Sequence, residues 1–239
     1  MVRIRSPTVR KRAAKETMEV YFFTDPLCPW SWAMEPAMSA LRAREDIEFH
    51  SILVGWLPSL AGRTVEAVAA EWSDAAAKTR ARIDPTYWDR VAPKTGLIAD
   101  VAVKAGNFQG AAKGEAYLTA LRRAVFEDGM DVADPNALAS LADACGLNGG
   151  IFRGDLGVGR YAAAEVVAAL DPKMGVADSV SWFGRWKVLR SWEALAEDIR
   201  NAERQKVTSP AIHFLRGKKE AVLRGYASGD QIDRTANAI

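Results

Sequence analysis

The sequence has few of the residue types that build a disulfide-stapled fold or a metal centre. Its 239 residues include two cysteines, Cys28 and Cys145, and two histidines, His50 and His213, which lie far apart in the sequence. Two cysteines are too few for a disulfide framework, and a structural zinc site needs four Cys or His ligands. We therefore expect thiols that stay reduced, as in cytoplasmic proteins, and no metal site.

The sequence also lacks long apolar runs. Hydrophobic residues make up 49% of the chain, which is enough for a sizeable core. No stretch approaches the roughly 18 uninterrupted apolar residues that a membrane-spanning helix needs. We therefore expect no membrane association.

Acidic residues are missing from the start of the chain. The first fifteen positions hold six basic residues instead, Arg3, Arg5, Arg10, Lys11, Arg12 and Lys15. The segment has no apolar stretch of the kind that marks a secretory signal. We interpret residues 1–17 as a solvated, disordered basic tail, with an arm for nucleic acid or another acidic partner, or an organelle address, as the alternatives. The rest of the chain has more acidic than basic residues, which argues against a nucleic-acid-binding protein.

The N-terminal region has the pattern of a strand, a helix and a second strand. Residues 19–24 form an aromatic and β-branched run typical of a buried strand, and residues 47–56 form another. Between them, residues 29–44 have helical spacing, with a kink expected at Pro36. This order implies parallel strands joined by a right-handed crossover.

The middle of the chain has the pattern of helices only. Helical signals rich in alanine and arginine extend from residue 65 to about residue 171. The predicted helices cover residues 65–83, 108–128, 135–145 and 161–170. We expect an all-helical insertion here.

The C-terminal region returns to strands. We expect a helix over residues 191–206 with Ser191 as its N-cap, then a hairpin of strands at 211–216 and 220–226. Residues 228–230 are expected to open a final helix.

One thiol occupies a position suited to redox chemistry. Cys28 ends the loop after the first predicted strand, and Pro29 is preorganised for the first helical position. Because the N–H groups and dipole of a helix N-terminus favour negative charge, the sequence predicts a lowered pKa for the Cys28 thiol. Trp30 offers an apolar surface to a partner. Asp25 either tunes the thiol or only shapes the turn that Pro26 makes.

The segment DPLCPWSWAMEP, residues 25–36, resembles the active-site segment of the DsbA family of thioredoxin-like proteins. It is most similar to the cytoplasmic FrnE-like branch of predicted dithiol-disulfide isomerases, which is related to kappa-class glutathione transferases and hydroxychromene-carboxylate isomerases. The resemblance implies an α/β, thioredoxin-like fold with a large all-helical insertion (DsbA-like). It divides the chain into a thioredoxin-like domain, residues 18–60 and 190–239, and a helical insertion domain, residues 61–189.

A second element of the family pattern lies near the C-terminus. The resemblance implies that Pro210 is a cis-proline that faces Cys28. The backbone at Thr208 and Ser209 would then pair with an extended peptide or with glutathione. The alternative is an ordinary trans proline at a strand start, a position that proline tolerates.

The fourth position of the motif departs from the family pattern. Ser31 stands where dithiol members have cysteine, so a mixed disulfide at Cys28 must wait for an external thiol. Cys145 is a poor substitute because its place at an apolar helix end favours a role as a small hydrophobe. The motif also resembles the Ser-Pro-aromatic-Ser motif of the kappa class, in which a glutathione carboxylate lies at a helix N-terminus. Asp230 and its neighbours would supply such a site here, or would act only as a helix cap.

Three functions follow from these patterns. The first is a monothiol disulfide oxidoreductase or isomerase, with Cys28 as nucleophile, Ser31 as hydrogen-bond donor to the sulfur, and Ser209 and Pro210 holding the substrate. The second is a glutathione-dependent transferase or isomerase of the kappa type, and the third is a non-enzymatic adaptor that presents a client protein. We expect no permanently bound cofactor, a monomer or homodimer in the cytoplasm, and protein or small-molecule thiols and disulfides, glutathione among them, as partners.

Overall fold

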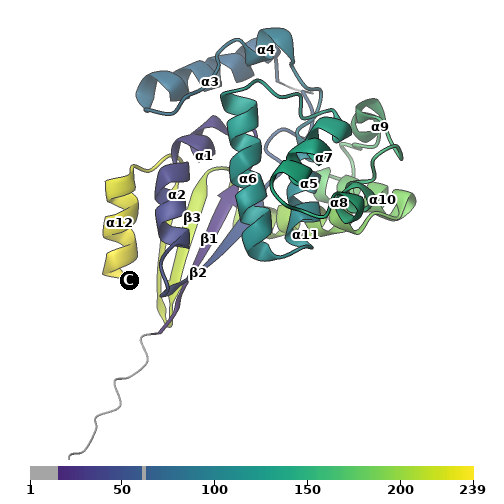
Figure 1. Ribbon diagram of the computed structural model, residues 1–239. Coiled ribbons are helices and arrows are strands. Elements are labelled where there is room, and N and C mark those ends of the chain that lie inside the picture. The colour runs from purple at the N-terminus through teal and green to yellow at the C-terminus, as the bar shows by residue number, and fades with distance from the viewer. Residues whose placement is uncertain (1–15, 61–62) are drawn as a thin grey trace, which may run out of the picture.

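A four-stranded sheet and the helices around it make up the part of the chain that the computed structural model describes, residues 16–60 and 63–239 (Figure 1). Residues 1–15 of the predicted basic tail lie outside the described residues. The strand order is β2–β1–β3–β4, with β1 parallel to β2 and antiparallel to β3. The strands are β1 (Met18–Thr24), β2 (Ile47–Leu53), β3 (Ala211–Arg216) and β4 (Lys219–Arg224).

Helices connect and surround these strands. They are α1 (Pro29–Ala33), α2 (Glu35–Arg42), α3 (Val65–Lys78), α4 (Tyr87–Arg90), α5 (Leu97–Asn107), α6 (Ala111–Phe126), α7 (Pro135–Ala144), α8 (Gly149–Leu156), α9 (Ala163–Ala168), α10 (Val176–Lys187), α11 (Arg190–Gln205) and α12 (Gly229–Ala238). Over the described ranges, none of them combines the length and the apolar character that crossing a bilayer demands.

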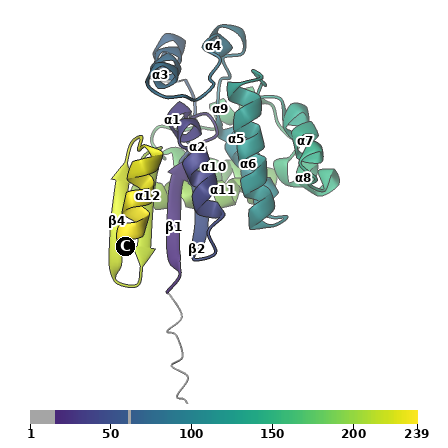
Figure 2. The same cartoon turned by 60° about the vertical axis from the view of Figure 1, so that its left-hand side comes forward.

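The central strand β1 buries both of its faces. On one face, Val20 and Phe22 pack with Met38 of α2 and Ile232 of α12 in one hydrophobic cluster. On the other face, Phe23 packs with Ala202 of α11, with Val207 and with Ala211 of β3. The alternation of strand side chains therefore places helices on both sides of the sheet (Figures 1 and 2).

The inserted helices share one continuous core with α11. Helix α5 is buried over nearly its whole length and packs against α6 and α11. Trp192 and Ile199 of α11 belong to the same hydrophobic cluster as Leu53 of β2 and the inserted helices. Helix α11 thus connects the sheet to the insertion.

The structure corrects two of the predictions made for individual helices. The helix expected over residues 29–44 is broken at Met34, which ends α1 and begins α2 just before Pro36. Ser191 is not an N-cap: Leu189 holds that position, and the Ser191 hydroxyl donates a hydrogen bond to the Asp155 carbonyl instead.

Four helices, α4, α5, α8 and α10, were also absent from the prediction. Helix α5 is buried on all sides, since every residue from Leu97 to Gly106 is buried. It therefore lacks the exposed, strongly charged face by which surface helices are recognised.

A buried ion pair ties the insertion to the end of β1. Arg122 of α6 is fully buried and donates a 2.6 Å hydrogen bond from Nη1 to Oε2 of Glu35 in α2. The same guanidinium donates to Thr24 Oγ1, at the last residue of β1. Thr119 also donates to Glu35, at 2.8 Å. The contact holds α6 and α2 against the loop that follows β1.

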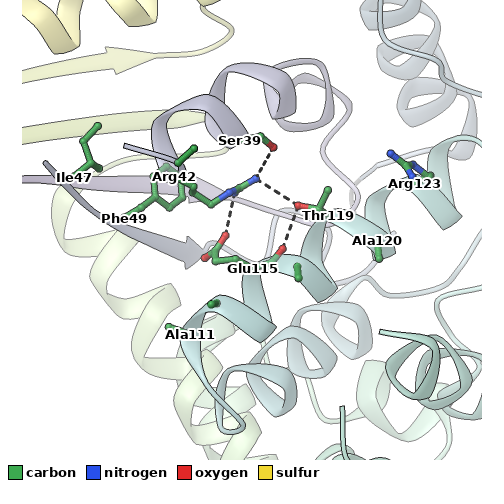
Figure 3. Close-up of a pocket in the computed structure, with 12 residues that line it drawn as sticks. Ser39, Arg42, Ile47, Phe49, Ala111, Glu115, Thr119, Ala120 and Arg123 are labelled. Carbon is green, nitrogen blue, oxygen red and sulfur yellow. Dashed lines mark hydrogen bonds and ion pairs between the residues drawn. The ribbon is translucent and has the colours of Figure 1, made fainter. Parts of the chain in front are cut away.

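The network continues to the surface through Arg42. Its guanidinium donates to Glu35, to Glu115 at 3.1 Å and to the Thr119 hydroxyl. Figure 3 shows Arg42 among the residues that line a hollow between α2, β2 and α6. Alanines make up much of the wall of this hollow, and Arg42 is paired within the protein.

Replacing Arg122 by methionine should destabilise the fold by about 3–5 kcal/mol, because it leaves the Glu35 carboxylate buried without its main partner. Chemical denaturation followed by circular dichroism measures the change. Arg123→Met is the matched control, because the Arg123 side chain is exposed on the same helix; it should change the stability by no more than about 0.5 kcal/mol. Equal effects of the two substitutions would contradict the role given to the ion pair.

Candidate functional site

The loop after β1 is held in place by the carboxylate of Asp25. Its Oδ1 accepts a hydrogen bond from Leu27 N at 2.8 Å, and its Oδ2 accepts one from Trp56 N at 2.7 Å. The Asp25 carbonyl also accepts a bond from Cys28 N, at 3.3 Å. One fully buried side chain thus fixes both the turn that precedes Cys28 and the segment that follows β2.

Cys28 is the N-cap of α1, with Pro29 in the first turn, as the sequence indicates. Its carbonyl accepts the first helical hydrogen bond, from Trp32 N at 3.1 Å. Helix α1 is only 5 residues long, so few peptide dipoles add up at its N-terminus.

The segment before β3 meets the start of α1. The Ser209–Pro210 peptide bond is cis, and the hydroxyls of Ser209 and Ser31 share a hydrogen bond of 2.8 Å. These two serines are 178 residues apart in the sequence. The fold therefore brings together the two segments that the sequence nominates, with Ser31 as the link.

The Cys28 thiol itself has no exposed surface. Burial raises the pKa of Cys28, and the hydrogen bonds that Ser209 and Ser31 offer to the sulfur lower it by less. The negative charge of Asp25 raises the pKa of Cys28 further. The expectation of an acidic thiol is therefore wrong for this structure: the loss of hydration outweighs the pull of a short helix.

Further acidic groups lie buried behind the site. Burial raises the pKa of Asp25 to about 6, against the hydrogen bonds from Leu27 and Trp56 that lower it. Asp100 of α5 is also fully buried, and neither of its carboxyl oxygens has a hydrogen-bond partner. Burial raises the pKa of Asp100 far above its ordinary value, and the charge of Asp25 adds to the rise.

An ion pair at the same depth partly balances these acids. Lys104, one helical turn after Asp100, pairs with Asp198 of α11, which accepts a 2.9 Å hydrogen bond from Leu53 N. The sequence analysis missed Asp100, Lys104 and Asp198. The signal that was present is an aspartate and a lysine four residues apart inside an otherwise apolar segment, LIADVAVKAG.

The other predicted site residues line the surfaces and hollows near the active-site turn. Trp30 is half-buried and packs on Tyr226, with ring centroids 5.8 Å apart. Thr208 and Ser209 line a small hollow of about 250 Å³. Asp230, in the first turn of α12, shares a larger groove of about 940 Å³ with Trp32.

Neither remaining candidate completes a second redox or metal centre. Cys145 is a half-buried free thiol at the C-cap of α7 and packs against the helical core. His50 stacks on Tyr21, with ring centroids 4.9 Å apart. Within residues 16–60 and 63–239, no group of three or more His, Cys, Asp and Glu side chains is arranged to hold a metal ion.

Comparison with known proteins identifies the fold. A family model described as Thioredoxin matches residues 21–167, more than half of the chain. The structure is similar to the cytosolic disulfide reductase DsbM from Pseudomonas aeruginosa, with a TM-score of 0.63 and 19% identity, covering 92% of this chain and 97% of that one. It is also similar to 2-hydroxychromene-2-carboxylate isomerase, with a TM-score of 0.54 and 15% identity, covering 92% and 93% of the two chains. These likenesses confirm the predicted α/β, thioredoxin-like fold of the DsbA type.

Curated relatives match part of the chain. The ClpXP adapter protein SpxH of Bacillus subtilis is 28% identical over 148 residues, which cover 59% of this chain and 49% of the adapter. The protein of the same name from Shouchella clausii is 30% identical over 156 residues, with coverage of 60% and 49%. The chain therefore spans about half the length of the curated relatives it matches.

The charge of Asp25 should be measurable at the Cys28 sulfur. With its pKa at about 6, Asp25 is ionised at neutral pH, where it opposes formation of the thiolate. Asp25→Asn should therefore lower the pKa of Cys28. A carbon-13 NMR titration of labelled cysteine Cβ, in a Cys145→Ser background, measures this without access of a reagent to the sulfur.

Asp230→Asn is the control, since Asp230 is exposed in α12, and it should leave the titration of Cys28 unchanged. In the unsubstituted chain the midpoint should lie above the ordinary value of about 8.5. A lower midpoint there, or no fall in Asp25→Asn, would contradict the electrostatic account.

Proposed function

The chain belongs to the thioredoxin family, and we propose that it is a thiol–disulfide oxidoreductase or isomerase that works through the single thiol of Cys28. The observation that carries the proposal is the meeting of two segments: Cys28 caps α1, and the cis Ser209–Pro210 bond lies across from it through the Ser31–Ser209 hydrogen bond. The similarity to a disulfide reductase and to a glutathione-bound form of the same reductase supports this choice of chemistry.

The exchange requires two steps. In the first, the Cys28 thiolate attacks one sulfur of a disulfide, forms a mixed disulfide and releases the other sulfur as a thiolate, which takes up a proton. In the second, an external thiolate attacks the mixed disulfide and returns Cys28 to its reduced form. Ser31 has no thiol and supplies only a hydroxyl, which stabilises the thiolate together with the Ser209 hydroxyl.

Burial of the sulfur sets a condition on this chemistry. Because Cys28 has no exposed surface, a disulfide reaches it only when neighbouring side chains move. The raised pKa lowers the fraction of thiolate at neutral pH and increases the nucleophilicity of each thiolate that forms. We therefore propose a slow, substrate-gated exchange in a reducing compartment, the cytoplasm, where both thiols stay free.

A non-enzymatic adaptor is the second candidate, favoured by the buried thiol and by the name of the curated relatives. An exposed pair of tryptophans also fits it. Trp182 and Trp186 of α10 are 45% and 56% exposed and stack on each other, with ring centroids 5.4 Å apart. Aromatic side chains of this kind are enriched at protein interfaces.

A glutathione-dependent transferase or isomerase of the kappa type is the third. It is favoured by the groove in which Asp230 and the N-terminus of α12 lie beside Trp32. In this function the tripeptide binds without a covalent step, and Cys28 or Ser31 stabilises its thiolate.

The first test asks which sulfur reacts. After incubation with excess low-molecular-weight disulfide, intact-mass spectrometry should find one adduct, which Cys28→Ser abolishes and Cys145→Ser retains. Cys145 is the more exposed of the two thiols, so an adduct on Cys145 alone would refute Cys28 as the nucleophile and leave the adaptor as the better candidate.

The second test restores the missing thiol. Ser31→Cys should allow the mixed disulfide at Cys28 to collapse into an intramolecular one, which the unsubstituted chain cannot form with Ser31. The variant should therefore release the adduct without added thiol, as followed by mass spectrometry and thiol titration. Ser31→Ala is the control and should keep the adduct until a thiol is added. An adduct that persists in Ser31→Cys would contradict the proposed geometry.

A further inference from the structure

A groove opens beside α1, where Trp32 and Ala33 at the C-terminal end of that helix line it. Its volume is about 940 Å³, which falls within the range of about 300–1,000 Å³ of small-molecule sites. In Figures 1 and 2, α12 lies on one side of α2 and α6 on the other, and α3 lies above α1. The groove is lined by residues of α1, α2, α6 and α12 and by the end of α3 with the segment that follows it.

Three arginines form the outer wall of this groove. Arg80 and Arg82 lie on the segment after α3, and Arg123 lies on α6; all three are exposed. None of the three guanidinium groups has an ion pair or a hydrogen bond within the described residues. Free guanidinium groups of this kind are the preferred protein partners of carboxylates and phosphates.

The acidic residues of the groove leave this positive charge in excess. Glu35 is buried against Arg122, and Lys78 is paired with Asp74, so these groups cancel within the protein. Glu127 and Asp230 are the exposed acids of the lining.

Two contacts join the lining of the groove to residues close to Cys28 in α1. Trp32 Nε1 donates a 2.8 Å hydrogen bond to the carbonyl of Arg82, which fixes the arginine segment against α1. At the other end, Tyr226 lines the groove and packs on Trp30, two residues after Cys28. A molecule bound along the arginines would therefore extend toward the turn that carries the thiol.

We infer that this groove selects a low-molecular-weight disulfide with carboxylate groups as the substrate of Cys28, through Arg80, Arg82 and Arg123. The inference rests on the proposed exchange at Cys28 and adds the charge of the partner. In the exchange one half of the disulfide stays on the Cys28 sulfur while its carboxylates pair with the arginines. The other half leaves as a thiol.

The experiment compares three disulfides of different charge: anionic glutathione disulfide, neutral bis(2-hydroxyethyl) disulfide and cationic cystamine. Intact-mass spectrometry gives the rate of adduct formation on Cys28 in a Cys145→Ser background, and each rate is divided by the rate of the same disulfide with a free small thiol. The anionic disulfide should react about tenfold faster than the cationic one on this scale. Added salt should reduce that preference.

The triple variant Arg80→Gln, Arg82→Gln, Arg123→Gln should reduce the rate with the anionic disulfide by about tenfold and leave the neutral one within about twofold. The triple variant Lys173→Gln, Arg185→Gln, Lys218→Gln removes the same charge from exposed sites outside the groove. It should leave all three rates within about twofold of the starting values. Far-ultraviolet circular dichroism checks that both variants fold.

The outcomes separate this inference from the function on which it rests. If none of the three disulfides forms an adduct on Cys28, the proposed exchange is wrong. If all three react but the order does not follow charge, or the preference survives loss of the arginines, the exchange stands and the substrate assignment is overturned. Equal losses in the two triple variants would mean that net charge steers the disulfides and would also overturn the assignment to the groove.

Discussion

The Asp25 carboxylate is the contact on which the geometry of the site depends. It accepts hydrogen bonds from Leu27 N and Trp56 N and so satisfies two backbone amides in loops that have no other strand or helix partner there. Without those bonds, two N–H groups would be buried unpaired, at a cost of about 1–3 kcal/mol each. The carboxylate is itself fully buried, and its raised pKa shows that the fold holds it at an electrostatic cost.

Two influences on the pKa of Cys28 oppose each other at this site. A cysteine at a helix N-terminus is normally made acidic by backbone N–H groups. Here the same turn buries the sulfur and sets Asp25 beside it, so the thiol is less acidic than a free cysteine. Buried charges that a fold retains against its own stability are typical of functional sites rather than of packing. Such a site favours a thiol kept protonated until a partner opens the pocket, and it disfavours one that is permanently reactive.

Much of the thioredoxin-like part could be predicted from sequence, because its signals are local. The strands around Phe22 and Phe214 are short aromatic and β-branched runs, and the Cys28–Pro29 step is a strong helix start. The expectation that the Ser209–Pro210 segment faces Cys28 followed from the family resemblance, since no local pattern joins residues so distant in sequence. The insertion was predicted less well. Helix α5 is buried on all sides and has no exposed charged face to mark it, and Asp100 was missed with it.

Helix α6 of the insertion contributes one buried and one exposed arginine to the surroundings of the site. On α6, Arg122 points into the protein and pairs with Glu35 behind the active-site loop, whereas the adjacent Arg123 points outward into the groove beside α1. Successive residues on a helix differ in direction by about 100°, so one helix serves the stability of the loop and the charge of its surroundings independently. The thioredoxin-like sheet fixes where the sulfur lies. We propose that the inserted helices select the molecules that approach it, so substitutions on their exposed faces should change that selection without disturbing the loop that carries Cys28.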